Sequence, residues 1–305
     1  MADPGSRAEW LGGASDEYLG RPLSPVARAA QNGKGVMGGG YRSIAGWAAG
    51  QAMITLASKS TEFGEITILK SRATGAIAYC HGDHYQSEAD PNGISLAGYI
   101  HALHALVAQT RSREVLMIGC GGGTLGTMLV ATGQRVTIVD IDPESIALAQ
   151  RYFALPPEID CHTGDGLDFL GRSQRVFDAI VVDAFAGDKV PVNLRSVEFF
   201  RLVRRRLAPF GSLFFNIFVA HDLDADADRI AGLMAEAEFQ VRLLDTPGRV
   251  ERNVIVMGGA VMALKPPAPL IMPSMGAEAI VTELEQMRFR GSRWRQHRVS
   301  GNRSS

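Results

Sequence analysis

The stretch Val115-Leu-Met-Ile-Gly-Cys-Gly-Gly-Gly-Thr124 decides the fold of this chain of 305 residues. Its apolar first part predicts a strand that is buried on both faces of a parallel sheet. The glycines that follow, Gly119, Gly121 and Gly123 in particular, remove side chains that would hold a ligand away from the backbone. A helix that begins near Thr124 would direct its free N–H groups at the bound molecule. The stretch therefore predicts a ligand-binding turn between a strand and a helix.

A second apolar strand, Val136-Thr-Ile-Val-Asp-Ile-Asp142, follows that helix. Asp140 ends it about 20 residues after the glycines, where a carboxylate can accept hydrogen bonds from ribose hydroxyls. Thr124 stands where a dinucleotide fingerprint has its third glycine, which disfavours a dinucleotide ligand. The two stretches together predict a nucleoside-binding α/β domain.

Strands and helices alternate through the rest of this region, as in a doubly wound sheet. The predicted strands are 115–118, 135–140, 159–162, 178–183, 212–218, 239–245 and 253–260, with an edge hairpin over 258–263. They predict a seven-stranded Rossmann-like domain over 93–287 that ends with a helix over 277–287. Three short strands that begin near residues 53, 65 and 75 predict a small antiparallel β-unit over 49–92.

Both ends of the chain differ from this pattern. Residues 1–48 are rich in Gly, Ala, Ser and Arg without sustained periodicity, which predicts a flexible extension with one short helix near 25–31. Residues 288–305 are rich in arginine and contain no acid, which predicts a flexible basic tail. Such a tail is typical of a solvated end, with binding of a nucleic acid or a partner as the alternative.

Composition narrows the classes of partner. The formal net charge of −1 argues against a nucleic acid or an anionic membrane as the partner of the whole chain. The cysteines Cys80, Cys120 and Cys161 lack the spacing of a zinc site or a disulfide framework, which favours a reducing, cytoplasmic setting. The start of the chain has no pattern of a secretory signal, and no apolar run approaches roughly 18 residues, so no membrane span is expected.

Two further acids follow predicted strands. Asp165 lies in Gly164-Asp165-Gly166 after the third strand, where it could accept a hydrogen bond from an adenine amino group, with Gly166 allowing close approach. Asp165 could also cap the following helix, and the two roles are compatible. Asp183 ends the fourth strand at the expected ligand crevice, where it could hold an amine nucleophile against an electrophilic sulfonium carbon. The alternative for Asp183 is a solvated strand end.

Taken in order, these motifs make residues 53–259 similar to spermidine synthase, the family of polyamine aminopropyltransferases. The resemblance also rests on motifs outside the glycine loop: Gly82-Asp-His-Tyr-Gln86, Gly98-Tyr99, Pro191, Glu198-Phe-Phe200 and Arg206-Leu-Ala-Pro209. It implies the fold of the S-adenosylmethionine-dependent methyltransferase superfamily. It also implies transfer of an aminopropyl group from decarboxylated S-adenosylmethionine to a small amine, with methylthioadenosine as the leaving group and without a metal.

The resemblance assigns roles to particular residues. Asp183 would orient and deprotonate the amine, and Gly119, Gly121, Gly123, Asp140, Asp165 and Gly166 would bind the nucleoside. Gln86, Tyr99, Phe185 and Asp188 would border the acceptor. Members of the family commonly pair their subunits, so a homodimer is one implied arrangement.

The departures from the family pattern leave the reaction open. Gly122 stands where the family has an aspartate that binds the amine of the aminopropyl group, and Ala186 stands where it has a second acid of the catalytic loop. Gly64 and Ile100 replace two polar residues of the acceptor site. Loss of the acid at Gly122 favours ordinary S-adenosylmethionine as donor, in a small-molecule methyltransferase or another alkyl-transfer enzyme. A third hypothesis is a non-catalytic nucleoside-binding homologue, against which the retained Asp183 counts.

His101 and His104 lie three residues apart on one predicted helix. A pair of histidines without a third ligand is more typical of packing or of a surface than of a metal site. No metal site is predicted.

Overall fold

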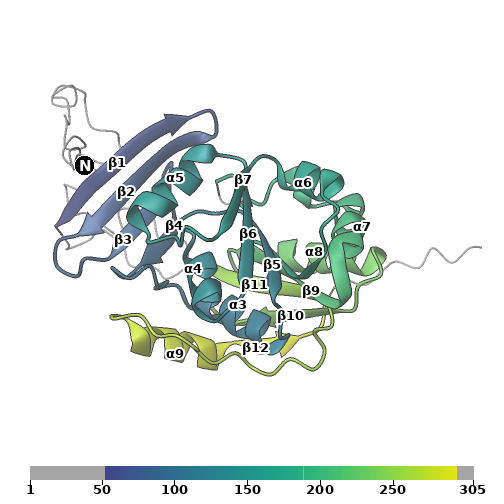
Figure 1. The fold of residues 1–305 in the computed structure, drawn as a ribbon. Coiled ribbons are helices and arrows are strands. Elements are labelled where there is room, and N and C mark those ends of the chain that lie inside the picture. The colour runs from purple at the N-terminus through teal and green to yellow at the C-terminus, as the bar shows by residue number, and fades with distance from the viewer. Residues whose placement is uncertain (1–51, 188, 294–305) are drawn as a thin grey trace, which may run out of the picture.

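The computed structural model describes residues 52–187 and 189–293, which form two sheets with helices around the larger one (Figure 1). The predicted extension over 1–48, its short helix and Asp188 lie outside the described residues. The α/β class and the order of a small antiparallel sheet before a larger, mostly parallel sheet are confirmed.

The small sheet consists of four antiparallel strands in sequential order. They are β1 (Met53–Thr61), β2 (Gly64–Ser71), β3 (Ile77–His81) and β4 (His84–Ala89). The prediction of three strands is therefore wrong. It missed β4, whose polar sequence His-Tyr-Gln-Ser-Glu-Ala is half-buried along nearly its whole length and so lacks the alternation of buried and exposed positions that marks a strand.

The large sheet has eight strands, one more than the seven predicted, in the order β12-β10-β11-β9-β8-β5-β6-β7. Its parallel part contains β5 (Glu114–Ile118), β6 (Arg135–Asp140), β7 (Asp160–Thr163), β8 (Phe177–Val182) and β9 (Leu207–Val219). The strands β10 (Val241–Asp245), β11 (Arg252–Gly259) and β12 (Arg288–Arg290) pair antiparallel. The carboxyl ends of the parallel strands thus meet at one edge, as the positions of the acids predicted.

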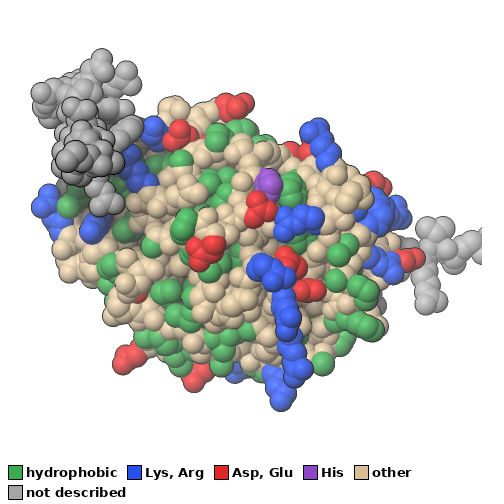
Figure 2. Space-filling view, viewed as in Figure 1, with side chains coloured by type: hydrophobic (Ala, Val, Ile, Leu, Met, Phe, Trp, Pro, Cys, Tyr) green, Lys and Arg blue, Asp and Glu red, His purple; other side chains and the backbone are tan. Residues whose placement is uncertain are grey.

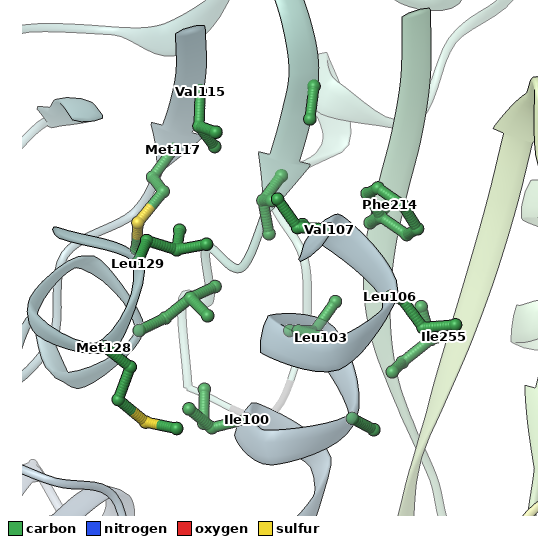
Figure 3. Close-up of a cluster of buried hydrophobic side chains, with 14 of the residues drawn as sticks. Ile100, Leu103, Leu106, Val107, Val115, Met117, Met128, Leu129, Phe214 and Ile255 are labelled. Carbon is green, nitrogen blue, oxygen red and sulfur yellow. The ribbon is translucent and has the colours of Figure 1, made fainter. Parts of the chain in front are cut away.

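Helices cover both faces of this sheet. One layer contains α3 (Gly98–Gln109), α4 (Thr124–Ala131), α5 (Pro143–Tyr152) and α9 (Ala277–Gln286), and the other contains α6 (Gly166–Arg172), α7 (Val197–Arg206) and α8 (Asp226–Glu236). Figure 3 shows Leu103 and Leu106 of α3 among the buried side chains of the first layer, with Phe214 and Ile255 from the sheet. Burial of this kind stabilises the fold by roughly 1.5–3 kcal/mol for each large apolar side chain.

The small sheet is joined to α5 by polar contacts as well as packing. The Thr61 hydroxyl donates to Asp142 Oδ2 at 2.7 Å, and Asp142 in turn caps α5. The hydroxyls of Tyr79 and Ser145 share a hydrogen bond of 2.7 Å. In Figure 1 the small sheet, drawn in purple, accordingly lies beside α5 at one end of the molecule. These contacts fix the small sheet relative to the parallel strands.

Two predictions for the last third of the chain are wrong. The edge strand is not the hairpin over 258–263, because β11 ends at Gly259 and β12 forms the edge beyond β10. The basic tail is not flexible from residue 288, since Arg290 in β12 forms ion pairs with Asp228 at 2.9 Å and Asp245 at 2.7 Å. These partners are distant in sequence, so arginine content alone could not reveal them.

The surface mixes charges of both signs. Figure 2 shows basic and acidic side chains next to one another near the centre of one face. No helix within residues 52–187 and 189–293 is long and apolar enough to cross a membrane.

Candidate functional site

A cavity of about 400 Å³ opens at the carboxyl ends of the parallel strands. The small sheet contributes part of its wall. The segments that follow β5, β6, β7 and β8, the turn that contains Pro191, and side chains of α3 and α5 also line it. It brings together all of the predicted site residues among the described ones except Gly123. The topology predicted this convergence, because the crevice of such a sheet lies outside the carboxyl ends of its strands.

The glycines of the loop after β5 permit close approach of the backbone. Gly119 has φ +99°, and a Cβ there would lie 2.2 Å from the carbonyl oxygen of Asp183. Gly121 lines the cavity, as does Gly166, where a Cβ would lie 2.5 Å from Ile118. Gly123 is the N-cap residue of α4 and does not line the cavity. Its φ of +67° and the 2.6 Å that would separate a Cβ from Leu155 Cδ1 explain the glycine there.

Asp140 connects the end of β6 to the glycine loop. Its Oδ2 accepts a hydrogen bond from the Cys120 amide at 2.7 Å, and its Oδ1 accepts one from the Asp142 amide at 2.9 Å. Burial raises the pKa of Asp140 to about 6, although both amides favour the charged form. Each carboxylate oxygen has a further lone pair, so Asp140 can hold the loop and still accept hydrogen bonds from a ligand.

Asp165 caps α6, as the alternative for this residue predicted. Its Oδ1 accepts from the Asp168 amide at 3.0 Å, and its Oδ2 accepts from Asn193 Nδ2 at 2.6 Å. Asp165 and Asn193 both line the cavity. The acceptor role of Asp165 toward an adenine amino group stays a prediction.

Asp183 follows β8 directly, and its carboxylate is held by neutral donors. Asn216 Nδ2 donates to Oδ1 at 2.8 Å, and the Tyr99 hydroxyl donates to Oδ2 at 3.5 Å. Burial raises the pKa of Asp183 to about 6, and these two hydrogen bonds oppose that rise. A carboxylate with a pKa close to neutrality in a cavity is suited to accept a proton.

Sequence reasoning missed the two asparagines that position Asp183. Asn216 is fully buried in β9, and its Oδ1 accepts a hydrogen bond from Asn253 Nδ2 of β11 at 3.0 Å. The signal was present as a single amide within the apolar stretch Phe214-Phe-Asn-Ile-Phe218. A buried amide is costly unless it is hydrogen-bonded, so its presence in a central strand points to a polar partner.

The predicted acceptor residues Gln86, Tyr99 and Phe185 line the cavity. Gln86 Nε2 is buried and has no hydrogen-bond partner within the described parts of the chain. An unpaired buried donor is costly, and a ligand oxygen would satisfy it. Asp188 is outside the described residues, so its predicted role is untested.

The structure fills the space beside two of the positions that depart from the family pattern. A Cβ on Gly122 would lie 2.9 Å from the Phe153 ring and 3.1 Å from Ser87 Cβ, and the Gly122 amide donates to Ser87 Oγ at 3.1 Å. Gly64 has φ +133°, and a Cβ there would lie 2.8 Å from His81 Nε2. An acid at Gly122 or a glutamine at Gly64 therefore requires its neighbours to move.

The two histidines of α3 are packing residues rather than surface residues, which is one of the two alternatives that the sequence left open. Both are fully buried, with His101 Nε2 at 2.8 Å from the Ser95 carbonyl and His104 Nε2 at 2.8 Å from Thr132 Oγ1. Burial lowers the pKa of both rings, that of His104 to about 4. Across the described residues, no group of three or more His, Cys, Asp or Glu is placed to hold a metal ion.

Comparisons with known proteins support the fold and show that the relatives of this chain are named as transferases. Residues 115–211 match a family model described as a methyltransferase domain. A probable polyamine aminopropyl transferase of Bifidobacterium longum is 33% identical over 43% of this chain and 30% of its own length. A polyamine aminopropyltransferase of Vibrio vulnificus is 32% identical over 38% of this chain and 41% of its own length. The chain thus covers less than half the length of these two relatives.

A solved structure extends the comparison to most of the chain. The crystal structure of a probable spermidine synthase from Corynebacterium glutamicum matches 78% of this chain and 91% of its own, with a TM-score of 0.64 and 22% sequence identity. The chain therefore has a divergent, spermidine synthase-like form of the methyltransferase fold.

Proposed function

We propose that the cavity binds an S-adenosyl sulfonium donor and that the protein transfers an alkyl group from it to a small amine. The first candidate for that group is the aminopropyl group of decarboxylated S-adenosylmethionine. The names of the two bacterial relatives support this choice, as does the four-stranded sheet that closes the cavity beside the parallel strands.

The residues present fit the nucleoside part of such a donor. The donor supplies an electrophilic carbon next to its sulfonium, which needs no metal to react. Gly119 and Gly121 of the glycine loop line the cavity and present backbone rather than side chains to it, which allows close approach of a ligand. Asp140 offers acceptor lone pairs for ribose hydroxyls, and Asp165 offers an acceptor for the adenine amino group.

Asp183 carries the catalytic part of the proposal. Asn216 and Tyr99 fix its carboxylate toward the cavity, and its pKa of about 6 leaves most of it ionised at neutral pH. In that state Asp183 orients an amine, accepts its proton as the nitrogen attacks, and stabilises the positive charge that develops on the nitrogen. Proximity in the cavity supplies the remainder of the rate enhancement.

One observation favours a second candidate, methyl transfer from ordinary S-adenosylmethionine. The position of the missing acid, Gly122, is closed by Phe153 and Ser87 rather than left open for a cationic amine. Without a carboxylate there, the site does not repel the carboxylate of ordinary S-adenosylmethionine. The methyltransferase-domain match over 115–211 supports the same candidate.

Product analysis by mass spectrometry tests both candidates. The protein is incubated with each donor and a panel of small amines, and alkylated amine and released nucleoside are quantified. We expect an aminopropylated amine and methylthioadenosine from the decarboxylated donor, and loss of product in Asp183→Asn. Asp168→Asn, which alters an exposed carboxylate paired with Arg172, serves as the matched control and should retain activity. A methylated amine would support the second candidate, whereas turnover by Asp183→Asn would contradict the assigned base.

A further inference from the structure

A second cavity of about 220 Å³ lies next to the first. Phe185, in the loop that follows Asp183, lines both cavities. The segment after it divides them, because Pro191 and Asn193 line the first cavity whereas Val192 and Arg195 line the second. A molecule whose amine lies at Asp183 and whose chain passes Phe185 would therefore place its far end in the second cavity.

The described lining of the second cavity has an excess of positive charge. It contains Lys189, Arg195 and Arg229 but a single acid, Asp226. That acid already accepts from Lys189 at 3.2 Å and from Arg229 at 2.8 Å. One carboxylate thus serves two cations, and the third has no counter-ion in the described lining.

Arg195 is the cation that is left over. Its Nε is buried and has no hydrogen-bond partner, and its side chain forms no ion pair within residues 52–187 and 189–293. A buried N–H of a guanidinium group that lacks an acceptor is costly, whereas an oxyanion pairs with this group through parallel hydrogen bonds. The cavity therefore contains an unused anion-binding group.

The remaining wall is apolar. Val190, Val192, Ile217, Ile230 and Leu233 line the same cavity. Such a wall suits a short hydrocarbon chain, and the carboxylate of the described lining, Asp226, is already paired with two cations. The acceptor expected from charge and shape is an amine at one end, methylene groups in the middle and an oxyanion at the other end.

We propose that the second cavity is an acceptor subsite in which Arg195 binds a carboxylate, so that the acceptor is an ω-amino acid rather than a polycationic amine. This assignment rests on the proposed function, because it needs the amine of the acceptor to react at Asp183. It agrees with Ala186 in the catalytic loop, where the second acid that would attract a polycation is missing.

The test uses probes of equal chain length with different far ends. Binding of ω-aminopentanoate, pentane diamine, n-pentylamine and aminopentyl phosphate is measured by calorimetry, with and without methylthioadenosine. We expect ω-aminopentanoate to bind on the order of tenfold tighter than pentane diamine and n-pentylamine, as one charge-assisted interaction would provide. Stronger binding of the phosphate probe would keep the oxyanion subsite but overturn the carboxylate assignment.

Variants assign the preference to one side chain. Arg195→Gln should remove the preference for ω-aminopentanoate over n-pentylamine, and Arg195→Lys should restore part of it. Arg201→Gln is the matched control, because Arg201 is exposed on α7 and lies 3.8 Å from Glu198, and this variant should keep the preference. Equal or tighter binding of pentane diamine by the wild type, binding of none of the probes, or an unchanged preference in Arg195→Gln would each overturn the proposal.

The acceptor subsite and the proposed function can fail independently of each other. Methylthioadenosine binding reports on the nucleoside site, and the probe series without it reports on the second cavity. A preference for ω-aminopentanoate without any nucleoside binding would refute the proposed function and leave the oxyanion site standing. Nucleoside binding without that preference would refute the acceptor subsite and leave the proposed function standing.

Discussion

Replacement of Asn216 by leucine tests how the structure sets the basicity of Asp183. The Asn216 side chain donates to Asp183 Oδ1 at 2.8 Å and so favours the ionised carboxylate. A hydrogen bond to a charged group contributes about 1.5–3 kcal/mol, and one pKa unit corresponds to about 1.4 kcal/mol. We therefore expect Asn216→Leu to raise the pKa of Asp183 from about 6 by roughly one to two units.

This change has a functional consequence with a definite sign. An ionised Asp183 is needed to accept a proton, so activity falls as the pH drops through its pKa. At pH 7 about nine-tenths of the wild-type carboxylate is ionised, and in Asn216→Leu about half or less would be. The acid limb of the rate profile should therefore move to higher pH.

Carbon NMR titration of a sample labelled at the aspartate carboxyl carbons measures the pKa without a substrate. The Asp183 resonance is assigned by its absence in Asp183→Asn. Asn193→Leu is the matched control, because Asn193 also lines the cavity but donates to Asp165, and it should leave the Asp183 pKa where it was. An Asp183 pKa that stays constant or falls in Asn216→Leu would refute this reasoning.

Three further changes probe the site and the fold. Gly122→Asp should lower the free energy of unfolding, measured by denaturant titration, by about 1–3 kcal/mol, because the new aspartate side chain would collide with the Phe153 ring. A variant as stable as the wild type would show that the space beside residue 122 is open. Burial raises the pKa of Asp140 to about 6, so methylthioadenosine affinity should fall below pH 6 as this carboxylate becomes protonated. Asp140→Asn should make the affinity nearly independent of pH. A wild-type affinity that does not change with pH would exclude Asp140 as the acceptor of the ribose hydrogen bonds. Arg290→Ala should lower the free energy of unfolding by about 3 kcal/mol, since it removes one of the two arginines that pair with the buried Asp245 carboxylate. Arg252 and Arg290 outweigh the effect of burial and lower the pKa of Asp245 below 3.8. The stabilisation is therefore present above pH 3.8 and is lost as the pH falls through the pKa of Asp245 in the folded protein.

The sequence could predict those parts of the site that depend on local pattern and chain topology. Asp140 and Asp183 follow apolar runs, so the rule for parallel sheets placed both acids at one edge before any contact was known. The cap by Asp165 was also predictable, because an acid before a short helix has a defined local partner.

The remainder depends on contacts between residues that are distant in sequence. Asn216 and Asn253 form one hydrogen-bonded pair only because β9 and β11 are neighbours in the sheet. The strand β12 pairs with β10, and its Arg290 forms ion pairs with Asp228 and Asp245. The sequence shows that Gly122 lacks a carboxylate, but only the structure shows that Phe153 fills the space.

Binding of methylthioadenosine, measured by calorimetric titration alongside S-adenosylmethionine and its decarboxylated form, tests the central claim most directly. We expect all three to bind through the nucleoside part, and the decarboxylated donor to bind most tightly if aminopropyl transfer is the reaction. Asp140→Ala should weaken binding of all three by about 1–3 kcal/mol. Tighter binding of ordinary S-adenosylmethionine would replace the first candidate with the second. Absence of binding by all three would contradict the nucleoside site itself.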